Sequence, residues 1–126
     1  QQAMLCDMIV AGEDAIIGFI GPEIGALCYG AYTVLPAIVG HHQANELLMT
    51  CKRISAQEAY RIGLVNQVVP SDQILNAALD MAKIIVNLPL KSIKYTKKAL
   101  RVPLANDNHL ATVNEGWKDI LGKLIK

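Results

Sequence analysis

The stretch from Gly18 to Gly40 reads GFIGPEIGALCYGAYTVLPAIVG, and the rest of the chain can be interpreted around it. Its one charged side chain is Glu23, which lies among apolar residues, glycines and two prolines. An acid in such surroundings is either solvated in a loop or held in a pocket, where burial raises the pKa of a carboxyl group toward neutrality. We therefore take Glu23 as a candidate proton-transfer residue, with a solvated loop acid as the alternative.

The composition is that of one globular domain in a reducing compartment. At 126 residues and 52% hydrophobic content, the chain is large enough to enclose a core. Its net charge of +1 gives no electrostatic case for binding nucleic acid or an anionic membrane. The cysteines, Cys6, Cys28 and Cys51, lack CxxC spacing, which argues against a disulfide framework and a zinc site. We expect a cytoplasmic protein.

An uncharged run over residues 24–45 reaches the length of a membrane span, but it does not have the character of one. Glycines, Pro36 and a polar end with His41 and His42 interrupt the run, so we expect no membrane span. The two histidines are adjacent in sequence and would point about 100° apart on a helix. We therefore interpret them as a helix start rather than as metal ligands.

Strand and helix patterns alternate over the first seventy residues. Apolar runs rich in β-formers predict strands at residues 7–12, 15–19 and 64–69, the first two joined by a turn at Glu13-Asp14. Helical patterns cover residues 31–39, with Gly40 as the stop, and run from 41 or 42 to 50. Ser55 and Glu58 have the spacing of a capping box, which starts a short helix ending at Gly63. This part of the chain therefore predicts an α/β fold.

From Ser71 onward the pattern is helical throughout. Apolar residues recur at helical spacing up to Val86, a second helix carries lysines after Pro89, and a third is expected from about residue 106 to 125 with Trp117 in its apolar stripe. We therefore divide the chain into an α/β part, residues 1–70, and a helical part, residues 71–126.

Four groups of residues form a recognisable set. They are Ala3-Met-Leu-Cys-Asp7 with Ile9-Val-Ala-Gly-Glu13, Leu35-Pro-x-x-Val39-Gly40 with Glu46-Leu-Leu-x-Thr50, Arg53-Ile-Ser-Ala-Gln-Glu-Ala59 with Gly63-Leu-Val65 and Val69-Pro70, and Pro89 to Leu100. Together they resemble the crotonase superfamily of enoyl-CoA hydratases and isomerases, over roughly residues 1 to 101. Since the chain opens on Gln1-Gln2 rather than a methionine, we expect it to be a piece of a longer protein. The resemblance implies that this piece is the C-terminal portion, because members of the family are about twice as long and have a first half that this chain does not match.

The resemblance implies a fold and an assembly. Residues 1–70 would be part of the family's ββα spiral, including the loop of the acyl pocket, and residues 71–126 would be its helical oligomerisation region. We expect a homo-oligomer, either a trimer or a dimer of trimers. The N-terminal half of the same protein, outside this chain, would supply the oxyanion-hole N–H donors.

The resemblance also implies a substrate and a set of site residues. The substrate would be an acyl-CoA; CoA enters as part of it, and no metal or other cofactor is implied. The residues expected around the acyl group are Ile20, Gly21, Pro22, Leu27, Cys28 and Tyr29, and those expected to contact CoA are Lys97 and Lys98. For the cysteine and tyrosine, filling a core is the alternative; for the lysines, it is a solvated helix face.

Family hydratases use two glutamates, and isomerases of the family use the second alone. Gln1 takes the place of the first acid; an amide can hold a water molecule but cannot take its proton at neutral pH. Glu23 resembles the second acid, which makes it the expected catalytic base or acid. A gap-free count from Gly18, however, puts Gly21 at that position, so the match requires a local insertion.

Two alternatives remain open from the sequence. The Gly-Pro-x-x-Gly pattern from Gly21 to Gly25 resembles dihydroxynaphthoyl-CoA synthase and ketocyclohexane-carboxyl-CoA hydrolase, which form or open carbon rings on CoA thioesters. In that branch an aspartate follows, and here the corresponding place is close to Cys28. The second alternative is an assembly module that has no activity in isolation.

Overall fold

The computed structural model describes residues 2–26, 28–100, 114–115 and 118–119. The chain forms two compact units, residues 1–79 and 80–126. The helices and 3-10 turns are η1 (Ala3–Leu5), η2 (Pro22–Ile24), α1 (Tyr29–Val39), α2 (His41–Thr50), α3 (Ala56–Arg61), η3 (Ser71–Gln73), α4 (Ile74–Val86) and α5 (Leu90–Leu100). The strands are β1 (Val10–Gly12), β2 (Ile16–Ile17), β3 (Ile54–Ser55) and β4 (Gln67–Val69). The expected α/β fold is confirmed as helix-rich, and the predicted domain boundary at residue 70 stays a prediction.

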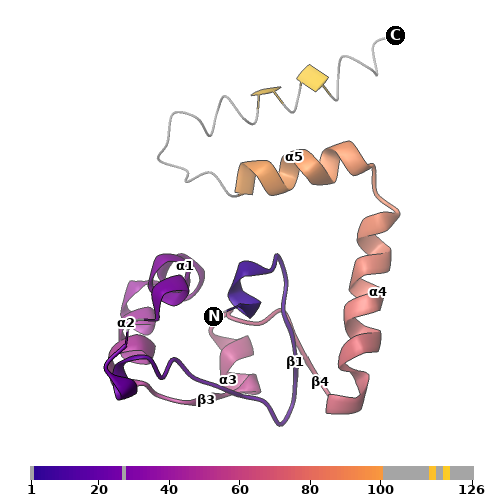
Figure 1. The fold of residues 1–126 in the computed structure, drawn as a ribbon. Helices are drawn as coiled ribbons and strands as arrows, with labels where there is room; N and C mark the ends of the chain where they lie inside the picture. The colour runs from indigo at the N-terminus through magenta and orange to yellow at the C-terminus, as the bar shows by residue number, and fades with distance from the viewer. Residues whose placement is uncertain (1, 27, 101–113, 116–117, 120–126) are drawn as a thin grey trace. The chain divides into compact units, whose positions relative to one another are not determined.

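The two N-terminal strands each pair with a strand from much later in the chain. β1 runs parallel to β4, with Ala11 opposite Val68, and the two lie side by side in Figure 1. β2 runs antiparallel to β3, with Ile17 opposite Ile54. A turn does join β1 to β2, closed by the Ala15 N–H donating to the Gly12 carbonyl at 3.0 Å, but the two strands belong to separate sheets.

The strand expected over residues 64–69 is shorter in the structure, because its first residues bond back to a helix. The Leu64 N–H donates to the carbonyl of Ala59 in α3 at 2.8 Å, and Gly63 at φ +80° provides the left-handed turn between them. The Asn66 N–H then reaches the Ile9 carbonyl at 2.8 Å, and β4 begins at the next residue. Leu64 and Val65 are therefore core residues rather than strand residues.

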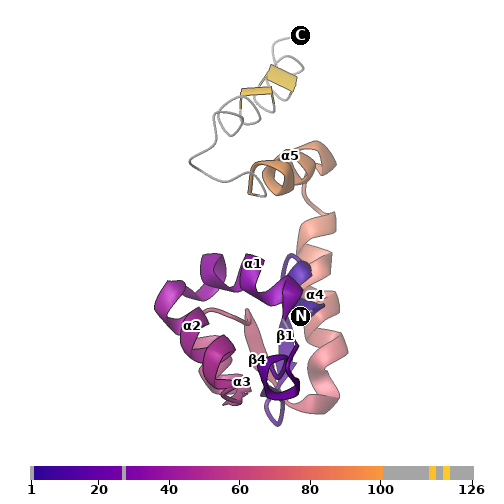
Figure 2. The same ribbon diagram turned by 60° about the vertical axis from the view of Figure 1, so that its left-hand side comes forward.

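The helices over residues 29–50 confirm the sequence prediction closely. α1 ends at Val39 and α2 begins at His41, with Gly40 between them at φ +83°. The two helices contact each other and lie side by side in Figures 1 and 2. Among the residues that the structure describes, the largest side chains that are wholly buried are Leu35 of α1 and Leu47 of α2. The rest of the core cluster comes from η1, β1, β3, the helices α1 to α3 and the segments between these elements: Met4, Ala11, Phe19, Cys28, Ala31, Ala44, Ile54, Ala56, Ala59, Leu64 and Val65.

The predicted capping box forms in part. The Ser55 Oγ accepts a hydrogen bond from the Glu58 N–H at 3.2 Å, which satisfies one free donor of the first turn of α3. The Glu58 carboxylate binds Arg61 instead of turning back to the serine, at 2.6 Å to Nε and 2.7 Å to Nη2. The serine cap is therefore what fixes the start of α3.

Replacing Ser55 by alanine is expected to lower the free energy of unfolding by about 1 kcal/mol, because the Glu58 N–H loses its acceptor. Urea denaturation followed by circular dichroism measures this change. Ser55→Asp is the control, since an aspartate at the same position also accepts from the first turn and should leave the unfolding midpoint close to that of the wild type. Equal losses in the two variants would contradict the cap as the cause.

The second unit and the helix leading into it carry exposed apolar side chains. Leu75 and Leu79 of α4, Val86 at its end and Leu90 of α5 are all exposed. The helices predicted after Ser71 and after Pro89 are confirmed as α4 and α5. Residues 114–115 and 118–119 are helical, and Trp117 with most of the third predicted helix lies outside the described residues. Over the part of the chain that the structure describes, no helix has the length and apolar character needed to cross a membrane.

Candidate functional site

Glu23 lies on a single 3-10 turn that is closed by backbone hydrogen bonds. Gly25 adopts a left-handed conformation, φ +69°, and its N–H donates to the Pro22 carbonyl at 3.2 Å. The Gly21 N–H donates to the Cys28 Sγ at 3.2 Å, and a Cβ on Gly21 would lie only 2.7 Å from that sulfur. Because only glycine allows this close approach, the loop holds η2, and Glu23 with it, in one position.

The Glu23 carboxylate is held by Arg53 through two parallel hydrogen bonds. Nη1 donates to Oε1 at 2.8 Å and Nη2 donates to Oε2 at 2.9 Å, the fork-to-fork geometry of a bidentate pair. The hydrogen bond from Arg53 is the main cause that lowers the pKa of Glu23 below its ordinary value, and it outweighs desolvation, which acts in the opposite direction. The sequence-based expectation of a pKa raised by burial is therefore wrong.

The error has a physical reason in the position of the cation. The residues next to Glu23 in sequence are apolar, whereas Arg53 comes 30 positions later and meets it through the pairing of β2 with β3. The Glu23 side chain is also 40% exposed rather than enclosed. Its lowered pKa means that the pair contributes to stability above about pH 4.5 and that this contribution is lost as the pH falls through the lowered pKa.

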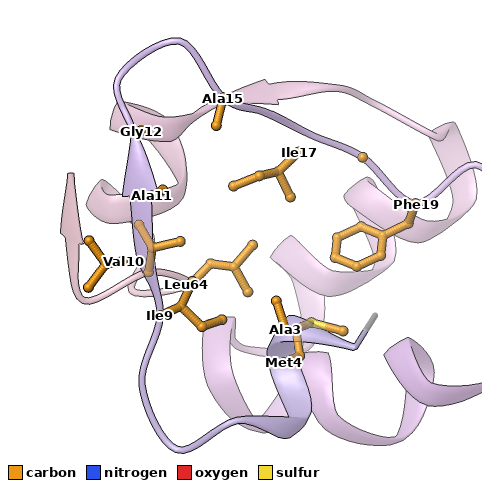
Figure 3. A pocket seen from close by; sticks show the side chains of 12 residues that line it. Ala3, Met4, Ile9, Val10, Ala11, Gly12, Ala15, Ile17, Phe19 and Leu64 are labelled. Carbon is orange, nitrogen blue, oxygen red and sulfur yellow. The ribbon is translucent and has the colours of Figure 1, made fainter. Parts of the chain in front are cut away.

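An apolar pocket of about 300 Å³ lies in the first unit, between η1, β1 and the segment around β2. Figure 3 shows side chains such as those of Ile9, Ile17 and Phe19 around this space. Its other lining residues are Ala3, Met4, Val10, Ala11, Gly12, Ala15, Gly18, Leu64 and Val65. None of these residues carries a charge, so the pocket suits an apolar group.

The pocket and the ion pair are linked through Gly18. Gly18 lines the pocket, and a Cβ built on it would lie 3.0 Å from the Arg53 Cγ, so the stem of this arginine passes close over the glycine. Arg53 in turn holds Glu23. Glu23 is thus connected to the lining of the apolar pocket through two contacts, one with Arg53 and one between Arg53 and Gly18.

The residues predicted around the acyl group lie in the segment between β2 and the start of α1, which also carries Glu23. Ile20 and Pro22 are exposed, Gly21 is half-buried, and Cys28 is buried with its sulfur turned to the Gly21 N–H. Leu27 and the side chain of Tyr29 lie outside the described part of the structure. The described members of this set do not line the apolar pocket, and their contact with an acyl group stays a prediction.

The two lysines predicted to contact CoA lie near the end of α5, where both are exposed. The Lys98 ammonium donates to the Glu115 carboxylate at 2.8 Å, and this hydrogen bond raises the pKa of the lysine. The Lys91 ammonium likewise donates to the Asp119 carboxylate at 2.8 Å. A hollow of about 450 Å³ lies among these four side chains, Lys94 and Tyr95. A role of Lys97 and Lys98 in binding CoA stays a prediction.

No arrangement for a metal ion occurs among the described residues. They contain no group of three or more histidine, cysteine or acidic side chains that could hold one. His41 and His42 are at the start of α2, as predicted, with their ring centroids 6.3 Å apart. Cys6, Cys28 and Cys51 are free thiols, and the last two are buried.

Sequence reasoning missed Arg53 as a site residue. Arg53 appeared there only as the first residue of a family-like motif, and none of its neighbours in the sequence pairs it with Glu23. The one available clue was Gly18, because an antiparallel pairing of β2 with β3 places a residue without a side chain opposite the arginine. Finding that clue required the register between two strands of two residues each.

The first unit is a helix-rich α/β unit with short paired strands, an apolar pocket and an acid held by an arginine. The family follows from comparison with known proteins. The sequence profile of the enoyl-CoA hydratase/isomerase family matches residues 1–126, so the chain belongs to this family, within the crotonase superfamily. The predicted superfamily is therefore confirmed.

Individual relatives agree with this assignment. A probable mitochondrial enoyl-CoA hydratase of Dictyostelium discoideum is 34% identical over 116 residues, which are 90% of this chain and 40% of that protein. The crystal structure of an enoyl-CoA hydratase from Bacillus anthracis is 29% identical with a TM-score of 0.87, and covers 94% of this chain and 47% of that one. The crystal structure of an enoyl-CoA hydratase/isomerase from Cupriavidus metallidurans is 26% identical with a TM-score of 0.88, and the match covers 95% of this chain and 46% of that one. The chain thus spans about half the length of the relatives that it matches.

Proposed function

We propose that this chain is the C-terminal portion of an acyl-CoA enzyme of the enoyl-CoA hydratase/isomerase type, with Glu23 as the group that moves a proton at the α-carbon of the thioester. Family membership supports the reaction class. The observation that carries the role of Glu23 is its fixed carboxylate, which is joined through Arg53 and Gly18 to the lining of an apolar pocket. The substrate class is then an acyl-CoA, and CoA is part of the substrate rather than a bound cofactor.

The proposed chemistry passes through a thioester enolate. When the proton leaves the α-carbon, negative charge moves onto the thioester carbonyl oxygen, which two N–H donors must stabilise; removal of one such donor typically costs about 100- to 1,000-fold in rate. We assign these donors to residues outside this chain. Glu23 accepts the proton and returns it, and Lys97 and Lys98 are the candidates for contact with the CoA phosphates.

The exposed apolar side chains support an assembled state. Leu75, Leu79 and Val86 follow one another along α4 at helical spacing, and such a stripe is normally covered by a neighbouring surface. We propose that α4 and α5 belong to the oligomerisation region of a trimer or a dimer of trimers. The alternative is that these helices bind other subunits and that the chain has no other function. The chain is then an assembly module and binds no acyl-CoA.

A ring-forming or ring-opening reaction on a CoA thioester is the second candidate. It is favoured by the turn from Gly21 to Gly25, where Pro22 begins η2 and Gly25 ends it in the left-handed conformation. This candidate uses the same enolate chemistry and differs in the carbon bond that is formed or broken. A cyclic ketoacyl-CoA as substrate distinguishes it from hydration or isomerisation of a straight-chain enoyl-CoA.

Isothermal titration with a straight-chain acyl-CoA tests the proposal. We expect saturable binding by the protein expressed from its complete open reading frame and no measurable heat from the 126-residue chain alone, because the site would need both halves. Free CoA is the control ligand, since it separates binding of the acyl group from binding of the nucleotide. If the longer protein binds neither a straight-chain nor a cyclic acyl-CoA, the proposal that it is an acyl-CoA enzyme is wrong.

A further inference from the structure

We propose that Arg53 is the positioning residue of the site: its guanidinium holds the Glu23 carboxylate in one orientation as a proton acceptor. The inference rests on the proposed function and adds to it a residue that does not touch the substrate but acts through another side chain. Both carboxylate oxygens are engaged, at 2.8 and 2.9 Å. A carboxylate held at both oxygens by a planar fork has little freedom to rotate.

The backbone around Arg53 is anchored independently of the ion pair. Arg53 directly precedes β3, whose Ile54 is buried and pairs with Ile17. The next position along this antiparallel pair sets Arg53 opposite Gly18, and the missing side chain of the glycine leaves room for the stem of the arginine. The guanidinium is therefore presented from a fixed strand end rather than from a mobile surface loop.

Glu23 is anchored equally well from its own side. The Glu23 N–H donates to the Ile20 carbonyl at 3.1 Å, and the loop is tied through the Gly21 N–H to the sulfur of the buried Cys28. Two side chains from separately fixed elements meet without having to order a flexible segment. Such pre-organisation is what a proton-transfer group requires, because misplacement by about 1 Å can cost about 100-fold in rate.

The Arg53–Glu23 ion pair contributes little to the stability of the fold. Side chains that are 54% exposed for Arg53 and 40% for Glu23 gain little folding stability from an ion pair, because water screens it. A structural role alone would therefore predict a small effect on stability and none on proton transfer. An effect on the protonation of Glu23 is the distinguishing consequence.

Arg53 also widens the pH range over which Glu23 is ionised. A carboxyl group with an ordinary pKa is already ionised at neutral pH, and the hydrogen bonds from Arg53 lower the pKa of Glu23, so it stays ionised at lower pH as well. The other titratable groups on the adjoining elements include the thiols of Cys28 and Cys51, Lys52, which pairs with Glu46 at 2.7 Å, and the Glu58–Arg61 pair of α3. Arg53 is the one charged residue that is a cause of the shift among the described groups.

In the proton-transfer step, a proton moves from the α-carbon of the thioester to the Glu23 carboxylate. The C–H bond at the α-carbon of the thioester breaks, the proton passes to a Glu23 oxygen, and the electron pair moves into the thioester to give the enolate. One carboxylate oxygen gives up its hydrogen bond to receive the proton while the other stays bound to Arg53. In the return step the proton leaves Glu23 for carbon, and the bidentate pair forms again.

The experiment compares Arg53→Gln and Arg53→Lys with a matched control, Arg61→Gln, in the protein expressed from its complete open reading frame. Arg61 also holds a glutamate through two hydrogen bonds, to Glu58 at 2.6 and 2.7 Å, but it lies on α3 and is not among the causes that shift the pKa of Glu23. Two quantities are measured for each variant: the pH titration of the Glu23 carboxyl by carbon NMR, and the pH profile of kcat/KM. Circular dichroism checks that each variant is folded.

We expect Arg53→Gln to raise the titration midpoint of Glu23 and to move the acidic limb of kcat/KM upward by the same amount, with kcat about 10- to 100-fold lower at neutral pH and KM changed little. Arg53→Lys keeps the charge without the fork and should lie between this variant and the wild type. Gly18→Ala, which crowds the arginine stem without removing its charge, should shift the titration in the same direction. Arg61→Gln should change neither quantity.

The outcomes separate this inference from the proposed function. An unchanged Glu23 titration and acidic limb in Arg53→Gln, in a protein that loses its activity in Glu23→Gln, would overturn the role of Arg53 alone. Full activity in Glu23→Gln would overturn the proposed role of Glu23 itself. A shift of equal size in Arg61→Gln would show that the effect comes from the overall charge and would also overturn the inference.

Discussion

Replacing Glu23 by glutamine is expected to lower kcat about 100- to 10,000-fold, while KM for the acyl-CoA changes little. Glutamine has the shape of glutamate, so the loop from Gly21 to Gly25 and the pocket should be unaffected. An amide, however, cannot accept a proton at neutral pH, and one of its two hydrogen bonds with Arg53 is lost because nitrogen replaces an oxygen. Steady-state kinetics with a straight-chain enoyl-CoA and with a cyclic ketoacyl-CoA measures the change.

Glu58→Gln is the matched control for this substitution. Glu58 is also paired with an arginine through two hydrogen bonds, and its pKa is likewise lowered, chiefly by its hydrogen bond to Arg61. The chemical change is the same, but it is made on α3, so activity should stay close to that of the wild type. If Glu23→Gln retains full activity on both substrates, the proton is moved by another group.

The helices were predictable because their signals are local. The stop at Gly40 and the cap at Ser55 are set by residues within one helical turn, and both occur in the structure where the sequence places them. The strands were predicted less well because their partners are distant. Nothing near β1 indicates that it pairs with β4 rather than with β2, and the bond from Leu64 back to α3 could not be read from an apolar run.

The same distinction separates what was and was not predictable in the candidate site. Glu23 was identified from its own neighbours, as the single charged side chain of a glycine-rich apolar stretch. Its protonation behaviour depends on Arg53, which strand pairing brings from 30 positions away, and here a local interpretation gave the wrong sign for the change in pKa. The apolar pocket likewise draws on residues from η1, β1 and the segment after α3, which no single motif contains.

Replacing Leu47 by alanine is expected to lower the free energy of unfolding by about 2–5 kcal/mol. Leu47 of α2 is wholly buried and is, with Leu35 of α1, one of the two largest such side chains in the described part of the chain. Truncation removes its transfer free energy and leaves a cavity, because the neighbouring helices relax only in part. A marginally stable domain can lose a third or more of its stability in this way. Urea denaturation followed by circular dichroism measures the loss.

Two variants on the same helix show whether burial is the cause. Met49 is 78% exposed, so Met49→Ala should change the free energy of unfolding by no more than about 0.5 kcal/mol. Leu47→Met conserves volume and should cost less than about 1.5 kcal/mol. This order of effects follows from α2 packing its Leu47 face into the core. A large loss in Met49→Ala would mean that the exposed face of α2 is itself covered, as it would be inside an oligomer or against another part of a longer chain.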